Sequence, residues 1–93
     1  MRISVWAYRR YVSPVMNPRG YTMLRTPVTS SNLASVGYDP TNRVLEIEFL
    51  SGSIYQYFNV PENIHDGLMQ AGSHGSYFDA FVKKAGYRSA RVR

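Results

Sequence analysis

The most regular pattern in the chain is a strict alternation of apolar and polar side chains over residues 43–50. The apolar positions are Leu45, Ile47 and Phe49, and the polar positions between them are Glu46 and Glu48. A period of two is typical of an antiparallel strand that buries one face and leaves the other in water. We therefore expect this segment to be the central strand of a sheet.

Two segments beside it have the composition of strands and are separated from it by turn residues. Residues 33–38 and 53–58 are rich in β-branched and aromatic side chains. Asp-Pro-Thr-Asn at 39–42 and Ser-Gly at 51–52 are turn sequences, because Pro presets φ, Asp and Asn bond nearby backbone, and Gly tolerates positive φ. The pattern predicts a three-stranded antiparallel β-meander.

The Ser-Gly turn determines which face each side chain of the third strand occupies. A two-residue turn pairs Phe49 with Ile54, so Ile54 joins the apolar face of the central strand. Tyr55 and Tyr57 then lie on the opposite face, beside the two glutamates. We expect both tyrosines to project away from the main core.

Two helices are predicted after the strands. Pro61 suits the first turn of the first helix, and Gly72 ends it. Ser73 or Ser76 provides the N-cap of the second helix, which ends near Gly86. The apolar residues that recur at helical spacing in the second helix are Phe78, Phe81, Val82 and Ala85. The expected fold class is α+β, with the three-stranded antiparallel β-meander followed by two helices packed on one face.

Composition removes several classes of function. The chain has 93 residues, enough for one domain, and no cysteine, which excludes disulfides, thiolate zinc sites and cysteine nucleophiles. His65 and His74 lack the close spacing that a metal site on one element needs. No serine lies in a nucleophile motif such as GxSxG. We expect no enzyme activity, no catalytic residues, no metal and no cofactor.

The net charge of +5 comes from the two ends of the chain. Residues 1–25 carry five arginines and no acid, residues 26–82 carry one base and six acids, and residues 83–93 carry five bases. We therefore divide the chain into a basic extension (1–25), a folded domain (26–87) and a basic tail (88–93). A basic end suggests a nucleic-acid partner, although short Lys/Arg-rich termini also serve as solubilising ends.

Residues 1–22 differ in character from the rest, since they mix arginines with aromatic residues and prolines. They lack the apolar stretch of about 7–15 residues that marks a secretory signal. No apolar run in the chain approaches the ~20 residues of a membrane helix. We expect a cytoplasmic protein without a membrane segment, whose extension is disordered or lies upstream of a translation start at Met23.

Four blocks of residues share their spacing with a known family of small domains. The blocks are 30–33 (Ser-Ser-Asn-Leu) with 36–39 (Val-Gly-Tyr-Asp), Leu45-x-Ile47-x-Phe49-x-x-Gly52, Tyr55-x-Tyr57-x-x-Val60-Pro61, and Ala71-x-Ser73-x-Gly75-x-Tyr77-Phe78. In these blocks, and in a Tyr87 followed by arginines, the chain resembles the KTSC domain, found at the C-terminus of lysyl-tRNA synthetases and alone in bacteria and phages. Residues 81–84 depart from the Ile-Arg type of stretch that the family often shows, and residues 1–22 have no counterpart. The resemblance implies a role near RNA, without fixing a ligand or an activity.

The first candidate site is the pair Tyr55 and Tyr57. Bases stack on exposed sheet aromatics at about 1–3 kcal/mol each, so the pair could form a stacking platform for single-stranded nucleic acid. Alternatively, the two rings pair across the strand with Glu46 and Glu48, or residues 1–22 cover them. The two carboxylates also repel phosphates.

The second candidate is the turn Ser73, His74, Gly75 and Ser76. Backbone N–H groups at a helix start, with two hydroxyls and a histidine nearby, can hold a phosphate. The alternative is an ordinary helix cap, which explains the same residues and is worth about 1 kcal/mol.

The third candidate is the basic C-terminal stretch. Its members are Lys83, Lys84, Arg88, Arg91 and Arg93. They could neutralise nucleic-acid phosphates, which would make binding fall with salt. The alternative is a solvated helix end whose cations complement the helix dipole.

Two functions from different classes remain. The first is a small, non-catalytic module that binds nucleic acid, RNA or another single strand, through the basic stretch, the turn and the tyrosines. The second is a protein-interaction or self-association module that uses the tyrosines and an open sheet edge. We expect a monomer or a weak homodimer in either case.

Overall fold

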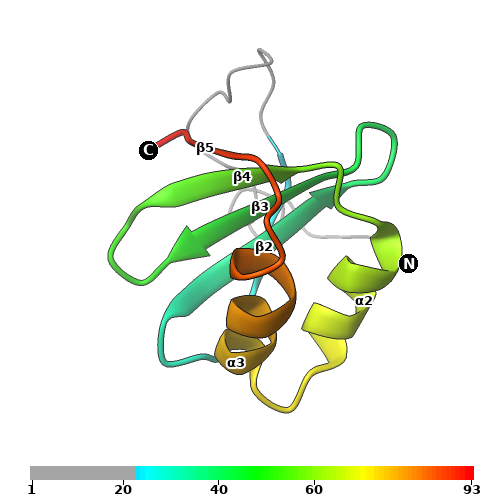
Figure 1. Ribbon diagram of the computed structural model, residues 1–93. Helices are drawn as coiled ribbons and strands as arrows, with labels where there is room; N and C mark the ends of the chain where they lie inside the picture. Colours follow the sequence, from blue (N-terminus) through cyan, green and yellow to red (C-terminus); the bar gives the residue numbers. More distant parts are fainter. Residues whose placement is uncertain (1–22) are drawn as a thin grey trace, which may run out of the picture.

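The structure is a computed structural model that describes residues 23–93, and its centre is one antiparallel sheet (Figure 1). The strands are β1 (Thr26–Pro27), β2 (Leu33–Asp39), β3 (Val44–Phe49), β4 (Ile54–Phe58) and β5 (Ser89–Arg91), and they lie in this order across the sheet. The helical segments are α2 (Glu62–Gln70), α3 (His74–Phe78) and the π-helical turn η1 (Asp79–Lys83). The α+β class and the meander are confirmed, with five strands in the sheet instead of three. The expectations for residues 1–22 lie outside the described residues.

The two additional strands occupy the edges of the sheet. At one edge β1 pairs Thr26 with Val36. At the other edge, β5 is formed by residues that we expected to be a tail. Backbone hydrogen bonds hold this segment to β4, from Phe58 N–H to Arg88 O (2.9 Å) and from Ile54 N–H to Arg93 O (2.8 Å). The basic tail at 88–93 is therefore bonded along β4, and its residues Ser89–Arg91 form the edge strand β5.

The hairpin between β3 and β4 differs from the expected one by a single residue. The loop has three residues, 50–52: Gly52 N–H bonds to Phe49 O and Phe49 N–H bonds to Ser53 O, both at 2.9 Å. Gly52 has a φ of +97°, which allows a tight turn followed by a bulge, where the Ser-Gly pair predicted a two-residue turn. The observed register pairs Leu45 with Tyr57.

This shift exchanges the two faces of β4, because a slip of one residue moves every side chain to the other side. Tyr55 is opposite Ile47, and Tyr57 is opposite Leu45. Both tyrosines therefore lie on the core side of the sheet. The expectation that they project away from the core is wrong.

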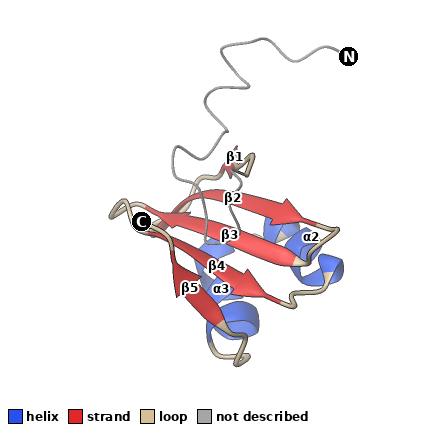
Figure 2. Cartoon of the chain, turned by 90° about the horizontal axis from the view of Figure 1, so that it is seen from above, coloured by secondary structure: helices blue, strands red, loops and turns tan. Residues whose placement is uncertain are grey.

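Both helices pack on this side of the sheet (Figure 2). The buried residues of the core cluster are Leu33, Val36, Leu45, Ile47, Tyr57, Val60, Leu68, Phe78 and Val82. Ser73 is the N-cap of α3, since its hydroxyl accepts the Ser76 N–H. The helices are therefore held to the sheet by buried apolar side chains, but two of the four apolar residues expected in the core from the second helix are exposed.

The first of the two is Phe81, which is 51% exposed. The helix that begins at α3 continues as the π-helical turn η1, in which Lys84 N–H bonds to Asp79 O. A π turn is wider than an α turn, so Val82 still faces the core, whereas Phe81 turns outward and packs on Tyr77. The second is Ala85, which lies in the turn after η1 and is exposed.

The other side of the sheet carries a buried polar network. Glu46, expected beside a tyrosine, accepts hydrogen bonds from Arg25 Nη1 (2.7 Å) and Gln56 Nε2 (2.9 Å). Ser35 Oγ accepts from Arg25 Nε at 2.9 Å and donates to Glu48 at 2.7 Å. Arg25, Ser35, Glu46 and Gln56 are all buried. Arg25 thus belongs to the folded domain, where its charge is paired with the Glu46 carboxylate.

Candidate functional site

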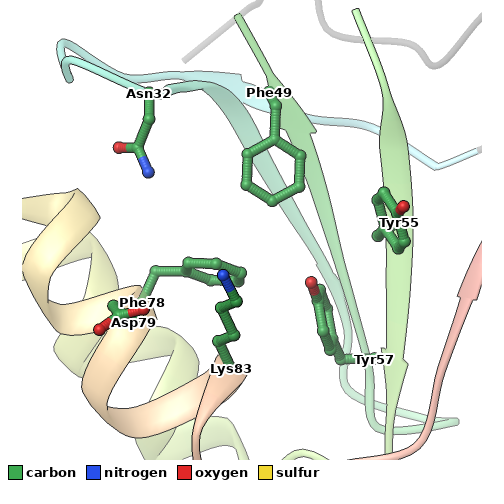
Figure 3. Close-up of a pocket in the computed structure, with 7 residues that line it drawn as sticks. All are labelled: Asn32, Phe49, Tyr55, Tyr57, Phe78, Asp79 and Lys83. Carbon is green, nitrogen blue, oxygen red and sulfur yellow. The ribbon is translucent and has the colours of Figure 1, made fainter. Parts of the chain in front are cut away.

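A cavity of about 330 Å³ opens on the helix side of the sheet, between the end of β3, β4 and the α3–η1 helix (Figure 3). Its lining residues are Asn32, Phe49, Tyr55, Tyr57, Phe78, Asp79 and Lys83. Three of them, Tyr55, Tyr57 and Lys83, come from the candidate sites of the sequence. The one-residue shift in β4 is what brings the tyrosines to this side.

Four aromatic rings form the wall of the cavity. Phe78 meets Phe49 and Tyr57 edge to face, with centroid separations of 5.5 and 5.6 Å. Tyr55 meets Phe49 edge to face at 5.9 Å and stacks beside Tyr57 at 6.5 Å. Edge-to-face pairs at these separations are favourable. The wall is therefore built by mutual packing of the rings, with the cavity beside them.

Tyr57 is the most buried of the polar wall residues. It is 8% exposed, and its hydroxyl makes no hydrogen bond within the described residues. Burial and the neighbouring Tyr55 raise the pKa of Tyr57 from 10.0 to about 12, because the charged phenolate loses water on burial. Tyr57 thus presents a neutral hydroxyl to the cavity at physiological pH.

This pKa shift predicts a loss of stability in alkali. The folded state holds the Tyr57 proton more tightly than the unfolded state. The protonated hydroxyl therefore contributes fully to the free energy of unfolding below pH 10, and this contribution is lost between pH 10 and about pH 12. Urea unfolding followed by circular dichroism at rising pH should show this fall in the free energy of unfolding. Tyr57→Phe should reduce the fall, and an identical pH dependence in both proteins would contradict it.

Lys83 supplies the cation of the cavity. Its side chain runs along the opening beside Phe78 (Figure 3), and it makes no ion pair or hydrogen bond with any described residue. Its neighbour Lys84 instead binds Asp79, with Nζ 2.9 Å from the carboxylate. The hydrogen bond from Lys84 lowers the pKa of Asp79. The rim therefore combines an unpaired ammonium with a carboxylate that stays ionised.

The other basic residues of the C-terminal stretch are divided between the two faces of the sheet. Arg91 is opposite Tyr55 and so lies on the helix side, where its guanidinium contacts Ser53 Oγ at 3.3 Å. Arg88 bonds through its backbone to Phe58, and alternation places its side chain on the other face. Arg93 lies 3.3 Å from Glu48 on that other face as well. The five cations do not form a single patch.

The Ser73–Ser76 turn borders a second, more polar cavity of about 460 Å³ that shares Asn32 and Asp79 with the first. Ser73 Oγ accepts the Ser76 N–H (3.2 Å) and donates to the Ser76 hydroxyl (3.0 Å). His74 Nδ1 lies 2.8 Å from Leu68 O, where it caps the end of α2. The two serines of this turn thus form an ordinary helix cap, and the His74 ring contacts the end of α2.

Gly75 has a packing role in the same turn. A Cβ at this position would overlap the side-chain oxygen of Asn32. The glycine therefore lets the helix approach the loop before β2, and it holds Asn32 at the junction of the two cavities. This accounts for the glycine without a phosphate.

Four lining residues were not among the candidates: Asn32, Phe49, Phe78 and Asp79. Phe49 and Phe78 have the spacing of core residues, and Phe78 is a core residue at 3% exposure, so the sequence did not mark either of them as part of a site. Asn32 lies within one of the blocks that resemble the KTSC domain, and that was the one signal that could have marked it. Asp79 reaches the cavity through the helix register, which its local sequence does not reveal.

No group of three or more His, Asp or Glu residues lies close enough within 23–93 to hold a metal ion. None of the helices in that range has the length and apolarity needed to cross a membrane.

Comparison with known proteins identifies the family. The model of the KTSC domain matches residues 29–87. The chain belongs to the KTSC domain family. The crystal structure of a KTSC domain protein from Yersinia pestis is similar, with a TM-score of 0.72 and 44% identity over 76% of this chain and 99% of that one.

Two relatives show the contexts in which similar domains occur. An uncharacterised protein of Stutzerimonas stutzeri is 41% identical over 75% of this chain and 99% of its own length. A lysine–tRNA ligase of a Nostoc strain is 39% identical over 75% of this chain, and the match spans 11% of the ligase. This KTSC domain is therefore similar to a stand-alone protein and to a small part of a tRNA ligase.

Proposed function

We propose that this KTSC domain is a non-catalytic module that binds single-stranded RNA on the helix side of its sheet. The binding surface, which we call the tyrosine face, consists of Tyr55, Tyr57, Lys83 and Arg91. The observation that carries the proposal is the aromatic cavity with an unpaired lysine on its rim and an arginine next to it.

Proteins bind single-stranded nucleic acid through two contributions, contacts of aromatic rings with the bases and neutralisation of the phosphates by cations. Aromatic rings on a sheet offer faces and edges to unstacked bases, and cations beside them neutralise the phosphates. Lys83 lies at one side of the tyrosines, and Arg91 lies at the other, in β5. An RNA strand that runs across β4 would therefore meet one cation on each side of the cavity.

The ligase context supports RNA as the nucleic acid. The relatives from Nostoc are named lysine–tRNA ligases, and a KTSC-like segment forms about a tenth of each. A module joined to a tRNA ligase is in the presence of RNA. For this chain, RNA is the nucleic acid to test first.

Fluorescence anisotropy with a short single-stranded RNA at rising salt tests the proposal. Two phosphate contacts, at Lys83 and Arg91, predict a slope of log K against log salt of about −1.4, and Lys83→Gln should reduce it to about −0.7. No binding at low salt would reject the proposal. A salt-independent dimer in light scattering would then favour the alternative, self-association through the open edge of β5.

A further inference from the structure

We infer that the aromatic cavity holds one unstacked base of the RNA, and that this base is guanine. The inference rests on the proposed function and adds a sequence preference to it. It is carried by the two residues that the aromatic cavity shares with its polar neighbour, Asn32 and Asp79.

The cavity has the form of a base site. Its volume of about 330 Å³ falls within the usual range of small-ligand pockets, and four aromatic rings form its wall. The hydroxyls of Tyr55 and Tyr57 make no hydrogen bond within the described residues, so they are available to a polar ligand. A flat heterocycle with polar edges matches such a lining better than an aliphatic group does.

Asn32 is held in one orientation before any ligand binds. Ser30 Oγ accepts the backbone N–H groups of Asn32 (3.3 Å) and Leu33 (3.2 Å) and donates to Asn32 Oδ1 (3.0 Å). Gly75 packs against the same Oδ1. The side-chain nitrogen is therefore the free end of the amide, and Figure 3 shows it directed toward Phe78 and the cavity. Asn32 thus offers a donor there.

Asp79 offers the acceptor on the same side of the cavity. Lys84 holds one carboxylate oxygen at 2.9 Å and keeps the group ionised. Lys84 contacts Oδ2, and Oδ1 makes no hydrogen bond with another described residue. The pair therefore presents one fixed donor and one anionic acceptor to the edge of a bound base.

Guanine is the RNA base whose edge fits this pair. Its N1–H and N2–H₂ groups are adjacent donors for a carboxylate, and O6 and N7 are acceptors for an amide N–H. Adenine places an acceptor at N1, next to the donor at N6, so its N1 lone pair would face the carboxylate. Uracil and cytosine have one ring and would leave part of the aromatic wall uncovered.

The test uses short RNAs of uridine with one variable central position, measured by fluorescence anisotropy. Guanine, inosine, adenine and an abasic site are compared, so that the number of phosphates stays constant. We expect guanine to bind at least about tenfold more tightly than adenine, and inosine, which lacks N2–H₂, to fall between them. Equal affinities for all four RNAs would overturn the inference while leaving the proposed function intact. No binding of any RNA would reject both.

Two variants assign the preference to this site. Asp79→Asn should abolish the preference for guanine over adenine, because the amide is neutral and replaces one acceptor oxygen with an NH₂ donor, while binding of the abasic RNA persists. Asp66→Asn is the matched control, since Asp66 is an exposed carboxylate on α2 paired with His65, and it should keep the preference. A guanine preference that survives Asp79→Asn would show that the base is read elsewhere and would overturn the inference.

Discussion

Glu46→Leu is expected to lower the free energy of unfolding by about 3–5 kcal/mol. Glu46 is fully buried, and the Arg25 guanidinium that faces it at 2.7 Å is only 5% exposed. Removing the carboxylate leaves a buried cation with a more distant partner, Glu48, at 3.6 Å. It also leaves the side-chain amide of Gln56 without its acceptor. For a domain of this size, such a loss is a large part of the total stability.

A double-mutant cycle separates the ion pair from the packing. Urea unfolding is measured for Glu46→Leu, for Arg25→Met and for both together. Because the double variant buries no unpaired charge at this position, it should be more stable than the sum of the single losses predicts. Additive losses would show that the two groups do not act as a pair and would contradict this account of the network.

Gly37→Ala has the second large expected effect, a loss of about 1–3 kcal/mol from overpacking. Residues 23–25 pass so close to β2 that a Cβ at position 37 would lie 2.5 Å from Leu24 O and 3.0 Å from Arg25 Cγ. A backbone carbonyl cannot move aside as a flexible side chain can. The substitution should therefore push this segment off the sheet and weaken the Arg25–Glu46 pair as well.

Gly72→Ala is the matched control for this substitution. No atom lies within 4 Å of a Cβ at position 72, and its φ is not in the left-handed region. Urea unfolding of the two variants should give a large loss for Gly37→Ala and a loss within about 0.5 kcal/mol for Gly72→Ala. Equal losses would mean that the close approach of residues 23–25 does not matter.

The fold was largely predictable because its signals are local. The alternation at 43–50 specifies the central strand, and the turn residues on both sides of it specify where the strand ends. Ser73 specifies where the second helix begins. The edge strands β1 and β5 were missed because two or three residues carry no periodicity. The π turn was missed as well, since the apolar spacing of Phe78, Phe81 and Val82 fits an ordinary helix.

The composition of the candidate site depends on the register between β3 and β4, which differs by one residue from the expected register. The Ser-Gly sequence fits both a two-residue turn and the third position of a longer loop, and the choice decides which side Tyr55 and Tyr57 face. The residue types of Tyr55, Tyr57 and Lys83 marked them as candidates, but the sequence did not predict that they line the same cavity. Arg25 looked like part of a basic extension, because its partner Glu46 is distant in sequence.

The division of the basic residues between the two faces allows a direct test of the tyrosine face. Arg88 and Arg91 belong to the same short segment and carry the same charge. Arg91 is opposite Tyr55, whereas continuing the alternation of β5 by one residue places Arg88 on the other face. Arg91→Gln and Arg88→Gln therefore change the net charge equally. Binding of a single-stranded RNA at low salt, measured by anisotropy, compares them. We predict that Arg91→Gln weakens binding and reduces the salt slope by about 0.7, whereas Arg88→Gln changes neither; equal effects of the two substitutions would contradict binding at the tyrosine face.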